Sequence, residues 1–148
     1  MNLYKQVNEW LLNYEPLNSW LYFNATPVIL GTAALNSVPG DRVTKEFIDG
    51  SKEKQLIFAI DMITQYDADG TSDINMDALD EVNHFSDWIE QQYTDDNFPD
   101  FGETNTVTKI EVLTNVPSLL VDATSQLAKY QFQSRITYKD ESEVVKNG

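Results

Sequence analysis

The sequence predicts an α+β fold in which an antiparallel-rich sheet of about four to five strands is covered by two helices, in the order helix, hairpin, helix, hairpin. Three stretches carry this prediction. In residues 54–66 and 127–139 every second side chain is mostly apolar, as in strands. Residues 75–93 repeat apolar side chains every three or four positions, as an amphipathic helix does. We expect one α+β domain over residues 1–139, followed by a polar tail over residues 140–148.

The stretch 54–66 organises the rest of the chain. Residues two apart share a face of a strand. The second face, which includes Asp61, is half apolar. A strand covered on one side only shows a polar second face, so we expect this strand to be central, with a helix or a neighbouring subunit over the second face. A buried helix is the alternative, but the β-branched residues and flanking turns favour a strand. The wholly apolar first face consists of Leu56, Phe58, Ile60 and Met62.

Composition narrows the functional classes. The 148 residues carry a formal net charge of −14 and no cysteine. A surface that grips nucleic acid needs clustered Lys and Arg, which argues against specific DNA binding. Disulfide and thiolate chemistry are excluded, and no apolar run approaches the ~20 residues of a membrane span. The N-terminus lacks the pattern of a secretion signal, which predicts synthesis in a cytoplasm and no membrane partner.

The first 42 residues divide into a helix and an apolar segment. Residues 2–14 repeat apolar side chains at helical spacing, Asn2 is a candidate N-cap, and Pro16 ends the helix. Residues 17–42 are too apolar for a solvated loop. They belong either to the core or to a surface that covers a partner.

The central strand pairs with the strand before it. Residues 43–48 have strand propensity. Residues 49–52 supply a tight turn in which Gly50 can take a positive φ angle. We therefore expect residues 43–48 and 54–66 to form an antiparallel hairpin.

The clearest helix covers residues 75–93. Asn75 is a candidate N-cap, Asp77 favours the positive end of the helix dipole, and the helix should end before residues 97–99. His84, the only histidine, is expected to be an exposed surface residue rather than a catalytic one. Helical spacing predicts that the apolar stripe consists of Leu79, Val82, Phe85, Ile89 and Tyr93.

A second hairpin follows this helix. Residues 107–113 form a strand that residues 115–117 interrupt, because proline is confined to edges and bulges of a sheet, and residues 119–122 continue it. Residues 127–139 then alternate between a buried face and a wet face. The wet face carries Arg135 and other scarce cations. It is either an ordinary solvated face, which we prefer, or a docking surface for an acidic partner.

No combination of residues in the sequence indicates catalysis. The sequence contains no phosphate-binding loop, paired histidines, nucleophile elbow or dinucleotide fingerprint. Residues 67–73 suggest a calcium loop, but aligning Gly70 with its sixth position puts Gln65 and Met76 at the first and twelfth positions, where neither fits. We expect no enzyme activity, no catalytic residue, no cofactor and no metal site.

Five short stretches, in their order and spacing, carry a resemblance to a known family. The chain resembles the minor capsid proteins of long-tailed bacteriophages, a group similar to tail terminator (tail completion) proteins. The resemblance covers residues 38 to 139, and the first 37 residues match only as a helix followed by a variable segment. The stretches are Val38-Pro39-Gly40, Phe47-Ile48-Asp49-Gly50-Ser51, Phe85-Ser86-Asp87-Trp88-Ile89-Glu90, Lys109-Ile110-Glu111-Val112-Leu113-Thr114 and Lys129-Tyr130-Gln131-Phe132-Gln133.

The resemblance implies a structural virion protein with no catalytic motif. It would form a homo-hexameric ring at the head-proximal end of the tail, stop growth of the tube, and contact the tail tube protein and the head-side connector or stopper protein. DNA would pass through the ring without specific binding. A head-completion (connector) protein of the same virion, an acidic DNA mimic, and a small enzyme using carboxylates of residues 67–80 are the alternatives.

Two apolar runs outside the clear elements are candidates for subunit contacts. Exposed apolar patches commonly mark partner surfaces. A ring needs a heterologous contact, in which one patch meets a different patch on the next copy. We expect these patches to consist of Val28, Ile29 and Leu30 on one side and Leu119, Leu120 and Val121 on the other.

Overall fold

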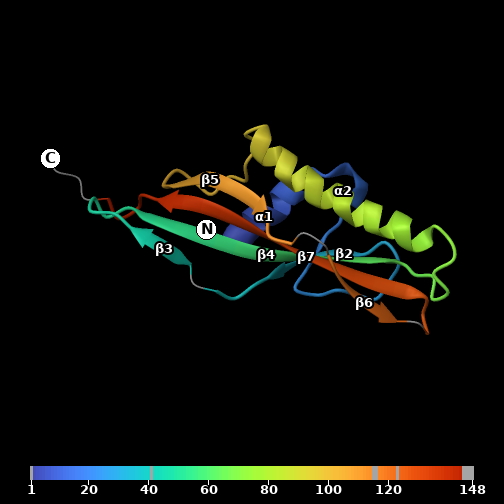
Figure 1. The fold of residues 1–148 in the computed structure, drawn as a ribbon. Helices are drawn as coiled ribbons and strands as arrows, with labels where there is room; N and C mark the ends of the chain where they lie inside the picture. The colour runs from blue at the N-terminus through green and yellow to red at the C-terminus, as the bar shows by residue number, and fades with distance from the viewer. Residues whose placement is uncertain (1, 41, 115–116, 123, 145–148) are drawn as a thin grey trace.

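The computed structural model describes residues 2–40, 42–114, 117–122 and 124–144, and it has an α+β fold with a mixed seven-stranded sheet and two α-helices. Both helices lie over one face of the sheet, and the loop between β1 and β2 lies on the other (Figure 1). In chain order the elements are α1 Leu3–Leu11, a 3-10 turn Glu15–Leu17, β1 Tyr22–Phe23, β2 Ala33–Ser37, β3 Val43–Glu46, β4 Lys52–Gln65, α2 Ile74–Thr94, β5 Asn105–Val112, β6 Ser118–Asp122 and β7 Leu127–Asp140.

Two long strands form the spine of the sheet. β4 and β7 pair antiparallel along their whole length, from Lys52 opposite Asp140 to Gln65 opposite Leu127. The free edge of β4 takes β2 at one end and β3 at the other, and the free edge of β7 is likewise divided between β6 and β5. β1 pairs with β2 in parallel, whereas each of these other pairs is antiparallel.

The predicted fold class is confirmed at the level of α+β, and the predicted strand count is too low. The β3–β4 and β6–β7 hairpins form as expected, and residues 119–122 continue the edge begun by β5. The sequence left residues 17–42 without an assigned strand, and the structure places β2 there together with β1, whose two residues pair in parallel with β2. Helix-hairpin-helix-hairpin is therefore only a rough description. The predicted interruption at Asn115 and Val116 lies outside the described residues.

The core lies between the helix-covered face of the sheet and the two helices. Register places Leu56 opposite Ile136 and Ile60 opposite Phe132, so the even-numbered side chains in the middle of β4 and β7, apart from Ser134, form one apolar surface. The helices add an aromatic layer, in which Tyr14 stacks on Phe85 at 4.4 Å between ring centroids. The sequence-predicted faces of α1, β4 and β7 are thus the buried ones.

His84 lies at the edge of this layer and is exposed, as expected. Its Nδ1 atom is hydrogen-bonded to the Tyr14 hydroxyl at 2.5 Å. Burial, together with the nearby Glu81 carboxylate, raises the pKa of Tyr14. This bond joins the end of the N-terminal segment to α2, which is a structural role.

The predicted cap of α1 is confirmed, whereas the predicted cap of α2 is replaced by a tertiary contact. Asn2 caps α1 by accepting from the Lys5 amide, but α2 begins after Asp73, and the Asn75 side chain instead bonds the backbone of Asp67.

Tyr93 is exposed rather than buried. Neither helix covers the second face of β4, because the chain between β1 and β2 lies there. No helix within the described residues is long and apolar enough to cross a membrane.

The acidic turn before α2 is held by its own hydrogen bonds. The Asp67 carboxylate accepts from the Ser72 hydroxyl at 2.7 Å and from the Asp69 amide at 3.0 Å. These bonds, the one from the Ser72 hydroxyl most of all, hold the pKa of Asp67 below its usual value. The carboxylate closes a local turn, as Asp commonly does.

A partly buried ion pair lies at the end of the spine where β4 begins and β7 ends, and its contribution to stability depends on pH. Lys54 Nζ donates to Asp140 Oδ2 at 2.7 Å. This bond and those from Ser142 lower the pKa of Asp140 from 3.8 to about 2. The unfolded carboxyl therefore takes up its proton first as pH falls. The pair's stabilisation is complete above pH ~4 and lost as pH falls through about 2.

We expect Asp140→Asn to remove about 2 kcal/mol of stability at pH 7 and very little at pH 2, since one pKa unit corresponds to about 1.4 kcal/mol. Urea unfolding of parent and variant at both pH values measures this difference. Lys54→Gln should reproduce the larger part of the loss at pH 7, because it removes the ion-pair partner but leaves the Ser142 bonds. A variant whose stability deficit is the same at both pH values would contradict the assignment.

Candidate subunit interface

The segment between β1 and β2 is pinned to the sheet face that the helices leave uncovered. Asn24, at a φ angle of 51°, accepts through its side chain from the Ser37 amide at 2.8 Å. At the other end Gly31, at a φ angle of 86°, donates its amide to the Ile63 carbonyl at 3.0 Å, and the Ile63 amide returns a bond to Thr32. Both ends of the segment are therefore fixed to β2 and β4.

A buried carboxylate anchors the middle of this segment. Asp61 of β4 is 3 % exposed and faces away from the helices. Its Oδ2 atom accepts from Thr26 Oγ1 and Asn36 Nδ2, each at 2.8 Å, and its Oδ1 atom accepts from Gln131 Nε2 at 2.8 Å. These three donors belong to the segment, to β2 and to β7. Asp61 thus joins three parts of the chain at one point.

The pinned segment holds three apolar side chains out of the core. Val28, Ile29 and Leu30 are each about 60 % exposed, although the backbone on both sides of them is bonded to the sheet. The Thr32 amide donates to the Ile29 carbonyl at 3.1 Å, which closes a turn beneath them. The backbone that carries these side chains is already held by hydrogen bonds, so it loses little conformational freedom when a partner binds.

Beside this segment, the end of the sheet forms an apolar hollow with a volume of about 290 Å³. Its floor is a row of direct cross-strand neighbours, Ile63 of β4, Lys129 of β7 and Leu120 of β6. Val28 lines it from the pinned segment, and Asp122 lines it from the end of β6. Hydrogen bonds from Ser125 and Thr124 hold the pKa of Asp122 below its usual value. The lining thus includes one acidic and one basic side chain, Asp122 and Lys129.

The structure brings the two sequence-predicted runs together. Both runs are exposed, with Leu119, Leu120 and Val121 at 48, 65 and 38 %. Val28, Leu120 and Val121 line the same hollow, so the runs meet at one surface instead of forming two opposed patches. Leu30 lines a neighbouring hollow against the start of α2, and Leu119 lies on the helix side of β6. Their role in subunit contact stays a prediction.

A second apolar site was missed by sequence reasoning. The strand predicted over residues 43–48 ends at Glu46, so Phe47 and Ile48 fall in the turn between β3 and β4. Ile48 is fully exposed, at 108 % of the reference value, and Phe47 is 45 % exposed. The signal was present, because two large apolar residues directly precede the Asp49-Gly50 turn.

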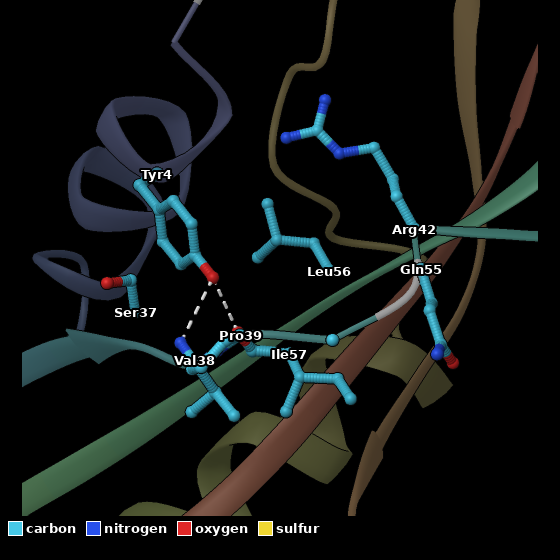
Figure 2. A pocket seen from close by; sticks show the side chains of 9 residues that line it. Tyr4, Ser37, Val38, Pro39, Arg42, Gln55, Leu56 and Ile57 are labelled. Atoms are coloured by element: carbon cyan, nitrogen blue, oxygen red, sulfur yellow. Dashed lines mark hydrogen bonds between the residues drawn. The ribbon is translucent and has the colours of Figure 1, made fainter.

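A larger hollow, of about 410 Å³, lies on the β4 edge where β2 has ended and β3 has not begun (Figure 2). Tyr4 bridges this gap, because its hydroxyl donates to the Ile57 carbonyl at 2.7 Å and accepts from the Val38 amide at 3.3 Å. Arg42 contributes the charged side chain of the lining. The tyrosine hydroxyl already serves two backbone groups, so it joins α1 to the sheet.

Two cations on the wet face of β7, Arg135 and Lys139, are engaged within the chain, whereas Lys129 on the same face lines the hollow. Arg135 pairs with Glu111 of β5, and Lys109 pairs with the same carboxylate at 3.0 Å. The Lys109 and Arg135 hydrogen bonds lower the pKa of Glu111. Lys139 lies 5.6 Å from the centre of the Phe47 ring. This arrangement favours the solvated-face interpretation over a docking surface for an acidic partner.

The described part of the chain contains no group of three or more His, Cys, Asp or Glu residues arranged to hold a metal ion. A scan against models of known protein families and a search of curated proteins both find no match. The site is therefore interpreted from its own geometry, and its main features are an apolar hollow and an apolar hairpin tip.

Proposed function

We propose that the protein is a structural ring subunit of a long-tailed bacteriophage, resembling a tail terminator that stops growth of the tail tube and joins it to the head-side connector. The observation that carries this proposal is the exposed apolar surface around Val28 and Leu120. An exposed apolar surface lowers solubility unless a partner covers it, and such patches commonly mark partner surfaces. The chain carries this surface together with a net charge of −14, which favours solubility.

The fold supports a ring subunit in a second way. The spine of β4 and β7 gives the subunit two separated ends, with an apolar hollow at one and an apolar tip at the other. A head-to-tail assembly needs two different patches on each copy. The acidic charge suits a ring that DNA traverses, because it discourages the phosphate backbone from adhering.

Leu120→Asp should lower the mass of the assembled protein while leaving the subunit folded. Leu120 is 65 % exposed, so a carboxylate there is solvated in the free subunit, but it becomes a buried charge when a partner covers the hollow. Light scattering gives the mass and circular dichroism checks the fold. The parent's mass should rise with salt, because screening lengths fall below about 10 Å above 0.1 M.

Met76→Asp is the matched control for this experiment. Met76 is 63 % exposed and lies in the first turn of α2, on the opposite side of the sheet, where an added carboxylate favours the helix dipole. It should keep the parent's mass. A folded Leu120→Asp variant with the parent's mass would place the contact elsewhere.

Electron microscopy of the protein alone and mixed with tail tubes tests the role of the ring. A tail terminator caps one end of each tube, whereas a head-completion protein, the alternative, leaves the tube ends bare and binds the head-side connector. A protein that forms no ring alone or on tubes would overturn the proposal.

A further inference from the structure

The turn between β3 and β4 projects from one end of the spine, and the hollow lies at the other. β4 rises about 3.3 Å per residue, so Lys52 and Ile63 are roughly 35 Å apart. The tip of a subunit therefore does not reach its own hollow (Figure 1). Ile48, the most exposed apolar residue described, is left uncovered by the described part of its own chain.

The tip has a fixed shape. The Gly50 amide donates to the Phe47 carbonyl at 3.0 Å, and the Phe47 amide donates to the Ser51 carbonyl at 2.9 Å. Asp49 Oδ1 accepts from the Ser51 hydroxyl at 2.6 Å and from its amide at 2.9 Å. Gly50 has a φ angle of 92°, and a Cβ atom there would lie 2.3 Å from the Glu143 carbonyl oxygen. The turn is thus held rigid with Ile48 at its apex.

The sizes of the tip and the hollow agree. An apolar cavity of about 150 Å³ holds a benzene-sized molecule, so the 290 Å³ hollow has room for the Ile48 side chain and part of the Phe47 ring. The hollow is lined by Val28, Ile63 and Leu120, which match an aliphatic side chain.

The local charges of the tip and the hollow also favour a contact between these two surfaces. The chain carries a net charge of −14, so most approaches between two copies bring like charges together. The tip segment 45–52 contains two lysines and two acidic residues, with Glu143 paired to Lys52, and the hollow contains Asp122 and Lys129, so neither place carries a large net charge. Asp49 beside Ile48 can face Lys129 of the hollow. Contact at these places avoids the repulsion that the rest of the surface imposes.

We propose that the β3–β4 tip of one subunit, with Ile48 at its apex, inserts into the hollow between the pinned segment and β6 of the next copy. This inference rests on the proposed ring, to which it assigns the two halves of the contact. Because the tip and the hollow are different surfaces, the contact is heterologous, and repeating it closes a ring when the rotation per subunit permits.

Cross-linking tests the contact directly, because the chain has no cysteine of its own. The double variant Ile48→Cys/Leu120→Cys is treated with a short bis-maleimide reagent and separated on a denaturing gel. Both positions are exposed, so both substitutions leave the core intact. The expected result is a ladder of linked subunits. Each single variant, and the control pair Met76→Cys/Leu120→Cys, should give no ladder. Ile48→Asp should lower the light-scattering mass as Leu120→Asp does.

The outcomes separate this inference from the proposed function. A parent that forms rings, with no ladder and an unchanged mass for Ile48→Asp, overturns the tip-and-hollow contact and leaves the ring standing. Cross-linking that stops at a dimer, with a dimeric mass, supports the contact and overturns the ring. A parent that stays monomeric at all salt concentrations, without cross-linking, overturns both.

Discussion

Phe58→Ala is expected to destabilise the fold by about 3–5 kcal/mol, as for a large aromatic side chain removed from a packed core. Phe58 is completely buried in β4, on the face covered by the helices. The strand is held on both edges at this position, by Ser37 of β2 and Ser134 of β7. Little collapse can fill the cavity that the substitution leaves. Denaturant unfolding followed by circular dichroism measures the loss.

Phe47→Ala is the matched control, since it removes the same side chain from a half-exposed position. Its expected cost is below about 1 kcal/mol, which is the scale of the cation–π contact with Lys139. A Phe58→Ala cost below about 1 kcal/mol would contradict the placement of Phe58 in the core. A large effect of Phe47→Ala would show instead that the hairpin tip is packed against its own subunit.

The parts of the fold that the sequence predicts are those decided by local periodicity. The buried faces of β4 and β7 follow from alternation over 14 residues each, and α2 follows from repeated spacing of apolar residues. β1 has only two residues, too few for a pattern, and its pairing depends on the bend that follows it. Asn75 has the chemistry of a cap, but the carbonyl and amide of Asp67 compete for its side chain.

The candidate site was predictable only in pieces. The sequence marks Val28 and Leu120 as too apolar for solvated loops, and both are exposed. Their meeting at one hollow depends on the register of β6 against β7 and on the path of the segment before β2. Ile48 was assigned to a strand that ends at Glu46, although two large apolar residues directly before the Asp49-Gly50 turn were a local sign of an apolar tip. Its exposure is a tertiary property of the projecting hairpin.

The hydrogen bonds of Asp61 explain why the chain accepts this buried carboxylate in the middle of its central strand. Burying a charge without a cation is costly, and hydrogen bonds offset that cost only when they are complete. The three side-chain donors come from Thr26, Asn36 and Gln131. An apolar residue at position 61 would pack without these bonds but would not fix the position of the segment. We infer that the carboxylate specifies where Val28 and its neighbours lie.

Asp61→Ala should therefore cost about 2–4 kcal/mol of global stability, because it takes the shared acceptor away from the part-buried donors of Thr26, Asn36 and Gln131. Thr26→Val is the graded control: it removes one donor at nearly constant shape and should cost about 1 kcal/mol. Urea unfolding measures both losses. Hydrogen exchange adds a local readout, since the Gly31 amide bonds the Ile63 carbonyl and should exchange faster in either variant. A loosened segment no longer holds Val28 and its neighbours in one position, so Asp61→Ala should weaken assembly even where the subunit stays folded. Unchanged exchange at Gly31 in Asp61→Ala would show that the backbone bonds alone hold the segment in place.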